Sequence, residues 1–264
     1  YSQPHLQTLS SESNYRQFEW GTAVYEDLCE QQVLTYAHQE ASVHDQVPQL
    51  LKAFGLKYGV VPRFSTTLSW LEEGELVLLA GQGLRFVHGH EFVSWQGLDG
   101  TEVPLYLSIA DPHNRDQIED FLAREAIAGH LHVPPILLSV PDLIEVDEAW
   151  IAEREKFDFV LLDEALEGRL EEYPPRARAR FYTNWSYIEG IRAEELSRAN
   201  WEAEISALRA EALNAMAFHL TGRPAESTDE IWQTILATQH HDVYCFCAPE
   251  LREKSIGWLK DVET

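Results

Sequence analysis

The sequence predicts an α/β domain with a mostly parallel sheet, followed from about residue 170 by a bundle of helices. Helix-like and strand-like segments alternate along residues 14–140, and this order is typical of a parallel sheet covered by helices. The pattern changes after Pro174 and Pro175. From residue 187 to 220 nearly every residue is a helix former, with apolar side chains close to one stripe. We therefore expect two domains, residues 1–170 and 171–264.

Periodicity and turn residues place the elements of the first domain. Residues 14–32 and 45–54 have helical spacing, and Gly55 is expected to end the second helix. The pair Asp99-Gly100 predicts a turn between two strands. A further helix is expected over residues 116–128. Strands are predicted at residues 58–61, 76–80, 85–87, 103–109 and 133–140.

The second domain reads as three helices. The long one covers residues 187–220 and is ended by Gly222 and Pro224. The next begins with Ser227 as its N-cap, and Glu230 stands at the capping-box position. The last covers residues 248–262, with Pro249 in its first turn.

Charge and cysteine content indicate which binding partners and which cellular compartment to expect. The chain has 20 Lys and Arg against 44 Asp and Glu, a formal charge of −24. Such a surface repels phosphate backbones, so we expect no binding to nucleic acid or to anionic membranes. The excess of acidic residues is also explained by solubility alone. Three cysteines form no disulfide framework, which favours a reducing, cytoplasmic location. The chain opens on Tyr1 without a methionine, and we expect that its true N-terminus is missing.

Four groups of polar side chains are candidates for chemistry. Two adjacent imidazoles followed by a carboxylate at a helix end can supply a metal ligand, although many such triplets are structural. Polar residues at the carboxyl ends of strands gather where α/β proteins bind ligands, but ordinary loops and helix N-caps look the same. An aromatic residue beside carboxylates suits a sugar face, yet a lone tryptophan is more often part of the core. The groups are Gln239–Asp242, Tyr36–Glu40 with His44 and Asp45, Asp142, and Trp95 with Glu91 and Asp99.

The order of several motifs resembles glycoside hydrolase family 38, the retaining α-mannosidases, and the resemblance covers essentially the whole chain. The similar segments are Tyr1–Pro4 with Glu12–Gln17 and Trp20-Gly21, Pro48–Tyr58, Phe92–Thr101, Tyr182–Tyr187 before a long helix, and Gln239–Asp242. The chain looks like an internal fragment of such an enzyme. The resemblance implies an incomplete parallel α/β barrel-like domain followed by a three-helix bundle, and hydrolysis of mannose-containing glycans with retention and one bound zinc ion.

The resemblance also assigns roles to residues. Asp142 falls on the general acid/base and His241 on a zinc ligand. The family's nucleophilic aspartate falls on Gln39, so its neighbour Glu40 is expected to act as nucleophile and metal contact. Two further zinc ligands would lie upstream of residue 1, which predicts that this fragment is inactive by itself. Sugar contacts are expected from Trp95, Asp242 and Tyr187.

Two other classes of function remain open from the sequence. The glutamine at the nucleophile position favours a non-catalytic carbohydrate-binding relative, whereas Glu40 and the intact His-His-Asp run oppose it. A metal-dependent hydrolase of another class would cleave esters or phosphates and leave glycosides intact.

Overall fold

The structure is a computed structural model that describes residues 2, 4–37, 43–60, 67–72, 75–80, 92–106, 120, 123, 160–172, 175, 178–180, 190–245 and 247–262. It divides the chain into two compact units. Unit 1 comprises residues 1–31 and 186–264, and unit 2 comprises residues 32–185. These units differ from the two domains expected from the sequence, residues 1–170 and 171–264, which stay a prediction. The first helix belongs with the C-terminal helices because its buried polar side chains bond to them, as described below.

Unit 2 is built on a five-stranded sheet with the order β1-β2-β6-β5-β7. Strands β1, β2 and β6 are parallel, β5 is antiparallel to β6, and β7 is parallel to β5. A separate antiparallel pair joins β3 and β4. The elements are β1 (Thr35–Ala37), α2 (Val47–Ala53), β2 (Tyr58–Val60), β3 (Thr67–Glu72), β4 (Glu75–Ala80), β5 (Phe92–Gln96), β6 (Glu102–Tyr106), α5 (Leu162–Glu172) and β7 (Arg178–Ala179).

Local sequence explains how several of these elements end. Gly55 has φ +77°, as expected for the residue that stops α2. The turn between β5 and β6 carries Gly100 at φ +85°, and the Thr101 backbone N–H donates to Asp99 Oδ1 at 2.9 Å. An aspartate that accepts from the backbone two residues on is the usual signature of this turn chemistry. The predicted Asp-Gly turn is confirmed.

One cluster of buried residues in unit 2 joins α5 to the sheet. Buried side chains of β2, β5 and β6 meet Leu166 of α5. Gly59 lies below Trp95, and a Cβ atom at Gly59 would come within 2.8 Å of a Leu105 methyl. A residue larger than glycine would therefore crowd the sheet here. The buried set is Tyr58, Val60, Phe92, Tyr106 and Leu166.

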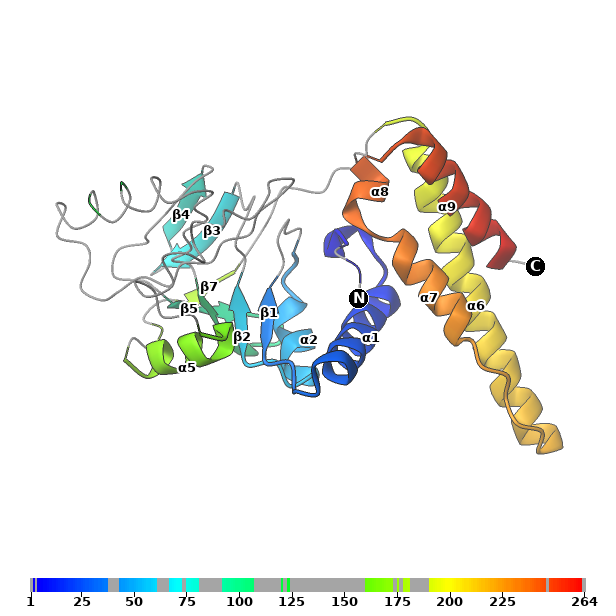
Figure 1. The fold of residues 1–264 in the computed structure, drawn as a ribbon, viewed down its shortest axis with the longest axis horizontal. Helices are drawn as coiled ribbons and strands as arrows, with labels where there is room; N and C mark the ends of the chain where they lie inside the picture. The colour runs from blue at the N-terminus through cyan, green and yellow to red at the C-terminus, as the bar shows by residue number, and fades with distance from the viewer. Residues whose placement is uncertain are drawn as a thin grey trace, which may run out of the picture. The chain divides into compact units, whose positions relative to one another are not determined.

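Unit 1 is helical, and α7 and α9 lie along the long helix α6 (Figure 1). Its elements are η1 (Leu6–Thr8), α1 (Ser11–Cys29), α6 (Ala193–Thr221), α7 (Asp229–Thr238), α8 (His241–Cys245) and α9 (Pro249–Val262). Helix α6 is ended by Gly222 at φ +68°, whose N–H donates to the Phe218 carbonyl. The predicted long helix, its glycine stop and the last helix with Pro249 at its start are confirmed.

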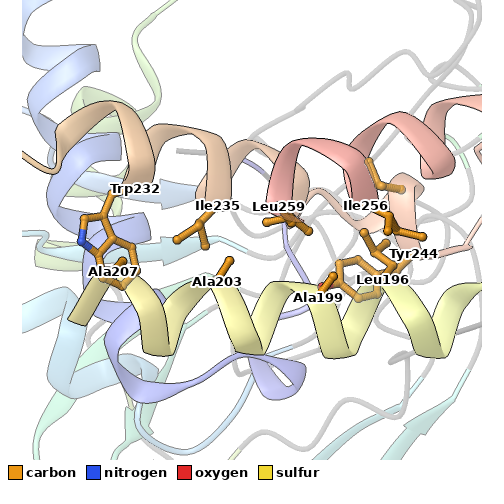
Figure 2. Packing of buried hydrophobic residues seen from close by; sticks show 10 residues of the cluster. Leu196, Ala199, Ala203, Ala207, Trp232, Ile235, Tyr244, Ile256 and Leu259 are labelled. Carbon is orange, nitrogen blue, oxygen red and sulfur yellow. The ribbon is translucent and has the colours of Figure 1, made fainter. Parts of the chain in front are cut away.

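The core of unit 1 follows a stripe of small residues on α6. Ala199, Ala203 and Ala207 face the larger side chains Trp232, Ile235 and Leu259 from α7 and α9 (Figure 2). Small side chains on one helix allow large ones on its neighbours to fill the space between the axes. This packing stabilises the helices α6, α7 and α9 against one another.

Serine side chains accept backbone N–H groups at the starts of α1 and α7. Ser10 caps α1 by accepting the Ser13 N–H at 3.0 Å. The N-cap of α7 is Thr228 and not Ser227 as predicted, although the Ser227 hydroxyl still accepts the Asp229 N–H at 3.1 Å. Serine can accept this bond from one position earlier because its side chain is short.

The architecture agrees with the prediction of an incomplete α/β barrel-like domain plus helices. Among the helices that the structure describes, none has the length and apolar content needed to cross a membrane. The predicted strands at 85–87 and 133–140 lie outside the described residues. So does the helix expected over 116–128, except for Asp120 and Ala123.

Candidate functional site

The candidate site is the turn that joins α7 to α8. Helix α7 ends at Thr238, Gln239 caps it, and α8 begins at His241. The N-terminal segment reaches the same turn, because Pro4 forms an antiparallel bridge with His240. The His240 carbonyl accepts the Val243 N–H at 3.0 Å. The sequence motif therefore folds into a tight turn that holds its three polar side chains together.

The three side chains His240, His241 and Asp242 form one compact group. The imidazole rings stack with centroids 4.4 Å apart and planes 25° apart. His241 Nε2 lies 3.5 Å from Asp242 Oδ1. The His241 side chain is only 6 % exposed, whereas Asp242 is 54 % exposed. A ligand from solvent would thus approach over Asp242 and reach a buried imidazole.

A third imidazole borders this group. The ring of His5 lies edge-on to that of His241 with centroids 5.7 Å apart, and His5 Nε2 is 3.3 Å from Cys245 Sγ. Burial, and then the nearby His241, lower the pKa of His5 from 6.5 to about 4. Burial also lowers the pKa of His240. His5 and His240 are therefore neutral at pH 7, and a neutral imidazole is the form that binds metals.

The hydrogen bonding of His240 defines its tautomer. Its Nδ1 accepts the backbone N–H of Asp242 at 3.2 Å, so in this arrangement Nδ1 carries no proton and Nε2 does. The 3.9 Å approach of Nδ1 to Asp242 Oδ2 is consequently no ion pair. To bind a metal, His240 would use Nδ1 in place of this backbone bond, or turn its ring.

The residues fit a divalent cation such as zinc. Two ligands of a tetrahedral zinc ion, each about 2.0–2.1 Å from the metal, lie roughly 3.3 Å apart. The His241–Asp242 separation of 3.5 Å is close to that value, and the ligand atoms of all three residues lie within 4.8 Å of one another. Imidazole and carboxylate donors suit zinc.

A buried polar network lies directly below the turn. Gln239 is fully buried, and its amide nitrogen lies 2.7 Å from Ser13 Oγ, 2.8 Å from Asn200 Oδ1 and 3.1 Å from Glu204 Oε1. Its amide oxygen accepts from Gln17 Nε2 at 2.9 Å. Burial raises the pKa of Glu204. The network ties α1 and α6 to the residue that precedes His240.

The sequence motif identified His241 and Asp242 but missed His5, Asn200 and Glu204. The signal for the last two was present. Both are polar, and both lie among the residues Leu196, Ala199, Ala203 and Ala207 on the buried stripe of α6. A polar pair on a core stripe indicates a buried hydrogen-bonded network. Nothing in the sequence marked His5, because its partners lie more than 230 positions away.

The other predicted site residues stand as follows. The ligand atoms of His241 and Asp242 lie within 4.8 Å of one another, and their metal-binding role stays a prediction. Asp142, Glu40, Gln39 and Tyr187 lie outside the described residues. Trp95 is fully buried in strand β5 of unit 2 and packs against Tyr36 with ring centroids 6.4 Å apart. The sequence left open whether Trp95 is a core residue or a sugar contact. Its position in the structure is that of a core residue and lends no support to a sugar contact.

Comparison with known proteins shows the fold and no family. No protein-family model matches the chain, and no curated protein sequence matches it. Among solved structures, the chain is similar to the 4-alpha-glucanotransferase from Thermococcus litoralis, with a TM-score of 0.55 and 13 % sequence identity. The match covers 100 % of this chain and 45 % of the other, so this chain spans less than half the length of that protein.

Proposed function

We propose that the chain is part of a carbohydrate-active enzyme that cleaves glycosidic bonds. The observation that carries this proposal is the likeness of its whole fold to a 4-alpha-glucanotransferase. A fold hosts many activities, so the likeness narrows the class and leaves the substrate to the site. Support for a sugar substrate also comes from the resemblance to glycoside hydrolase family 38, whose motifs run in order along the chain.

The finer proposal is retaining hydrolysis of α-mannosides. Retention needs two carboxyl groups about 5–5.5 Å apart, one to attack the anomeric carbon and one to protonate the leaving oxygen. Glu40 is proposed for the first role and Asp142 for the second, because they stand at or beside the family's positions. Tyr187 and Asp242 are proposed as sugar contacts. A cytoplasmic location stays a prediction from the sequence.

Zinc is proposed as the cofactor, held by His241, with Glu40 as a second contact; His240 and Asp242 are the additional donors beside His241. When bound, zinc would act as a Lewis acid toward sugar hydroxyls. The neutral His240 supplies a lone pair, and the exposed carboxylate of Asp242 offsets the charge of the cation. The burial of His241 keeps water from one side of the group.

The test is turnover by the protein as it is encoded, with this chain in its natural context. Aryl α-mannoside and aryl α-glucoside are offered with and without EDTA, and the anomer released first is followed by proton NMR. We expect Glu40→Gln and Asp142→Asn each to abolish release of the α-mannose product. Matched controls are Glu230→Gln and Asp229→Asn, which make the same changes in the exposed first turn of α7.

The outcomes separate the alternatives. Unchanged turnover in Glu40→Gln would remove Glu40 from the mechanism. Cleavage of the glucoside alone would support the proposed glycosidase activity and reject the mannoside as its substrate. Binding of oligosaccharide without cleavage would favour the non-catalytic relative. Metal-dependent cleavage of an ester or phosphate, with no glycoside cleaved, would show a hydrolase of another class and reject the proposal.

A further inference from the structure

The turn that carries the two imidazoles is held at both of its ends by buried side chains. Before it, the amide of Gln239 bonds to α1 and α6. After it, the Arg252 guanidinium donates to the Val243 carbonyl at 3.0 Å and to the Tyr244 carbonyl at 3.0 Å. Arg252 is 3 % exposed and Gln239 is fully buried. Only residues 240–242 lie between these two anchors.

The hydrogen bonds around Gln239 fix the orientation of its amide. The nitrogen faces three acceptors and the oxygen faces the Gln17 amide nitrogen, so the reverse orientation would set donor against donor. Ser13 Oγ donates to Glu204 at 2.6 Å and is therefore free to accept from Gln239. The two hydrogens of the Gln239 amide nitrogen therefore have three acceptors within range, and a buried network of this kind favours one arrangement of the core.

The residue before Gln239 is held in the same way. Thr238 Oγ1 accepts from Asn200 Nδ2 at 3.1 Å and donates to the Ile235 carbonyl at 2.8 Å. Asn200 thus reaches two consecutive residues, one with its amide nitrogen and one with its oxygen. One side chain of α6 therefore holds the side chains of two successive residues where the chain enters the turn.

We propose that Gln239 is the positioning residue of the candidate site, and that its buried network with Ser13, Asn200 and Glu204 sets the orientation of the His240–Asp242 turn. Gln239 touches neither ligand nor metal in this role. It acts through the backbone, in the manner of the outer-shell partners that orient metal ligands. The inference rests on the proposed function of this turn as the cation-binding part of the site.

The test compares Gln239→Leu with Trp232→Phe. Leucine keeps much of the volume of Gln239 but removes its hydrogen bonds. Trp232→Phe is the matched control, because it deletes the 2.7 Å bond from Trp232 Nε1 to Glu211 within the same bundle and lies outside the Gln239 network. Both variants are expected to lower thermal stability, so stability alone does not distinguish positioning from packing.

Two measurements distinguish them. In metal-free protein, the ring proton shifts of His240 and His241 report their stacking; we expect them to move toward unfolded values in Gln239→Leu and to stay in Trp232→Phe. With Co²⁺ as the probe, followed by visible absorption, we expect Gln239→Leu to bind 10–100-fold more weakly than wild type and Trp232→Phe to bind as wild type. Unchanged ring shifts and unchanged Co²⁺ affinity in Gln239→Leu would overturn the inference.

Failure of the proposed cation site is recognised separately. Wild-type protein that does not bind Co²⁺ removes the metal proposal, and the ring shifts then decide the positioning role alone. Should Gln239→Leu not fold, Asn200→Ala replaces it, since this change removes a partner and leaves Gln239 in place. Ring shifts in Asn200→Ala that match those of wild type would count against the inference in the same way.

Discussion

The burial of His5 predicts that acid destabilises unit 1 in a defined pH range. Its pKa is about 4 in the folded protein and 6.5 for an unperturbed histidine. Between these values the unfolded chain binds more protons than the folded one, so the free energy of unfolding falls as the pH is lowered. Above pH 6.5, neutral His5 makes its full contribution to the free energy of unfolding. The difference between the two pKa values, at about 1.4 kcal/mol per pH unit, means that about 3 kcal/mol of this free energy is lost by pH 4.

The perturbation is His5→Gln, which keeps a polar side chain but cannot titrate. We expect its free energy of unfolding to change less between pH 7 and pH 4.5 than that of wild type, by about 2–3 kcal/mol. The assay is urea unfolding in EDTA, followed by circular dichroism at a series of pH values. His219→Gln is the control, because it also replaces a histidine by glutamine but does so at an exposed position of α6.

Other groups titrate in this range, which is why the comparison with the variant is needed. Burial lowers the pKa of His240 and His44 in the same direction. Burial raises the pKa of Glu204, whose effect has the opposite sign. If wild type and His5→Gln have parallel stability profiles from pH 7 to pH 4.5, the folded protein does not hold His5 neutral and the reasoning about its burial is refuted.

Three further predictions concern unit 1. Ile235→Ala should lower the free energy of unfolding by about 3 kcal/mol, because a fully buried side chain is replaced by a cavity; a loss below 1 kcal/mol in urea unfolding would contradict the packing in Figure 2. Arg252→Leu should cost about 3 kcal/mol, since it strips hydrogen-bond donors from the carbonyls of Ile191, Val243 and Tyr244; unaltered amide exchange in α8 would argue against it. Burial raises the pKa of Glu204, so the free energy of unfolding should fall as the pH rises above about 4.5, and Glu204→Gln should remove this fall. An equal fall in wild type and variant would show that Glu204 does not cause it.

Much of the fold could be predicted because local signals and tertiary packing agree. The glycines at 55, 100 and 222 all have positive φ, which is the conformation that made them readable as stops and turns. The α6 stripe was visible as an apolar period. The place of α1 in unit 1 was not predictable in this way, because α1 is joined to that unit through buried polar bonds such as Gln17 to Gln239, and such bonds leave no trace in a hydrophobic pattern.

The site was predictable only in part, for a physical reason. A motif of consecutive residues such as His240–Asp242 is found from the sequence because the chain itself holds it together. His5 reaches the same group from the other end of the chain, and only the fold brings it there. For Trp95 the sequence left two roles open, because an aromatic residue next to carboxylates fits either a sugar site or the interior of a sheet, and the side chain is fully buried.

The decisive measurement of glycosidic-bond cleavage is the hydrolysis of an aryl α-mannoside by the encoded protein. We expect release of the phenol and of mannose with its α configuration retained. This activity should be lost in both Glu40→Gln and Asp142→Asn and kept in Glu230→Gln and Asp229→Asn. Absence of cleavage of every α-glycoside offered, by a protein that is folded, would contradict the claim that it acts on glycosidic bonds.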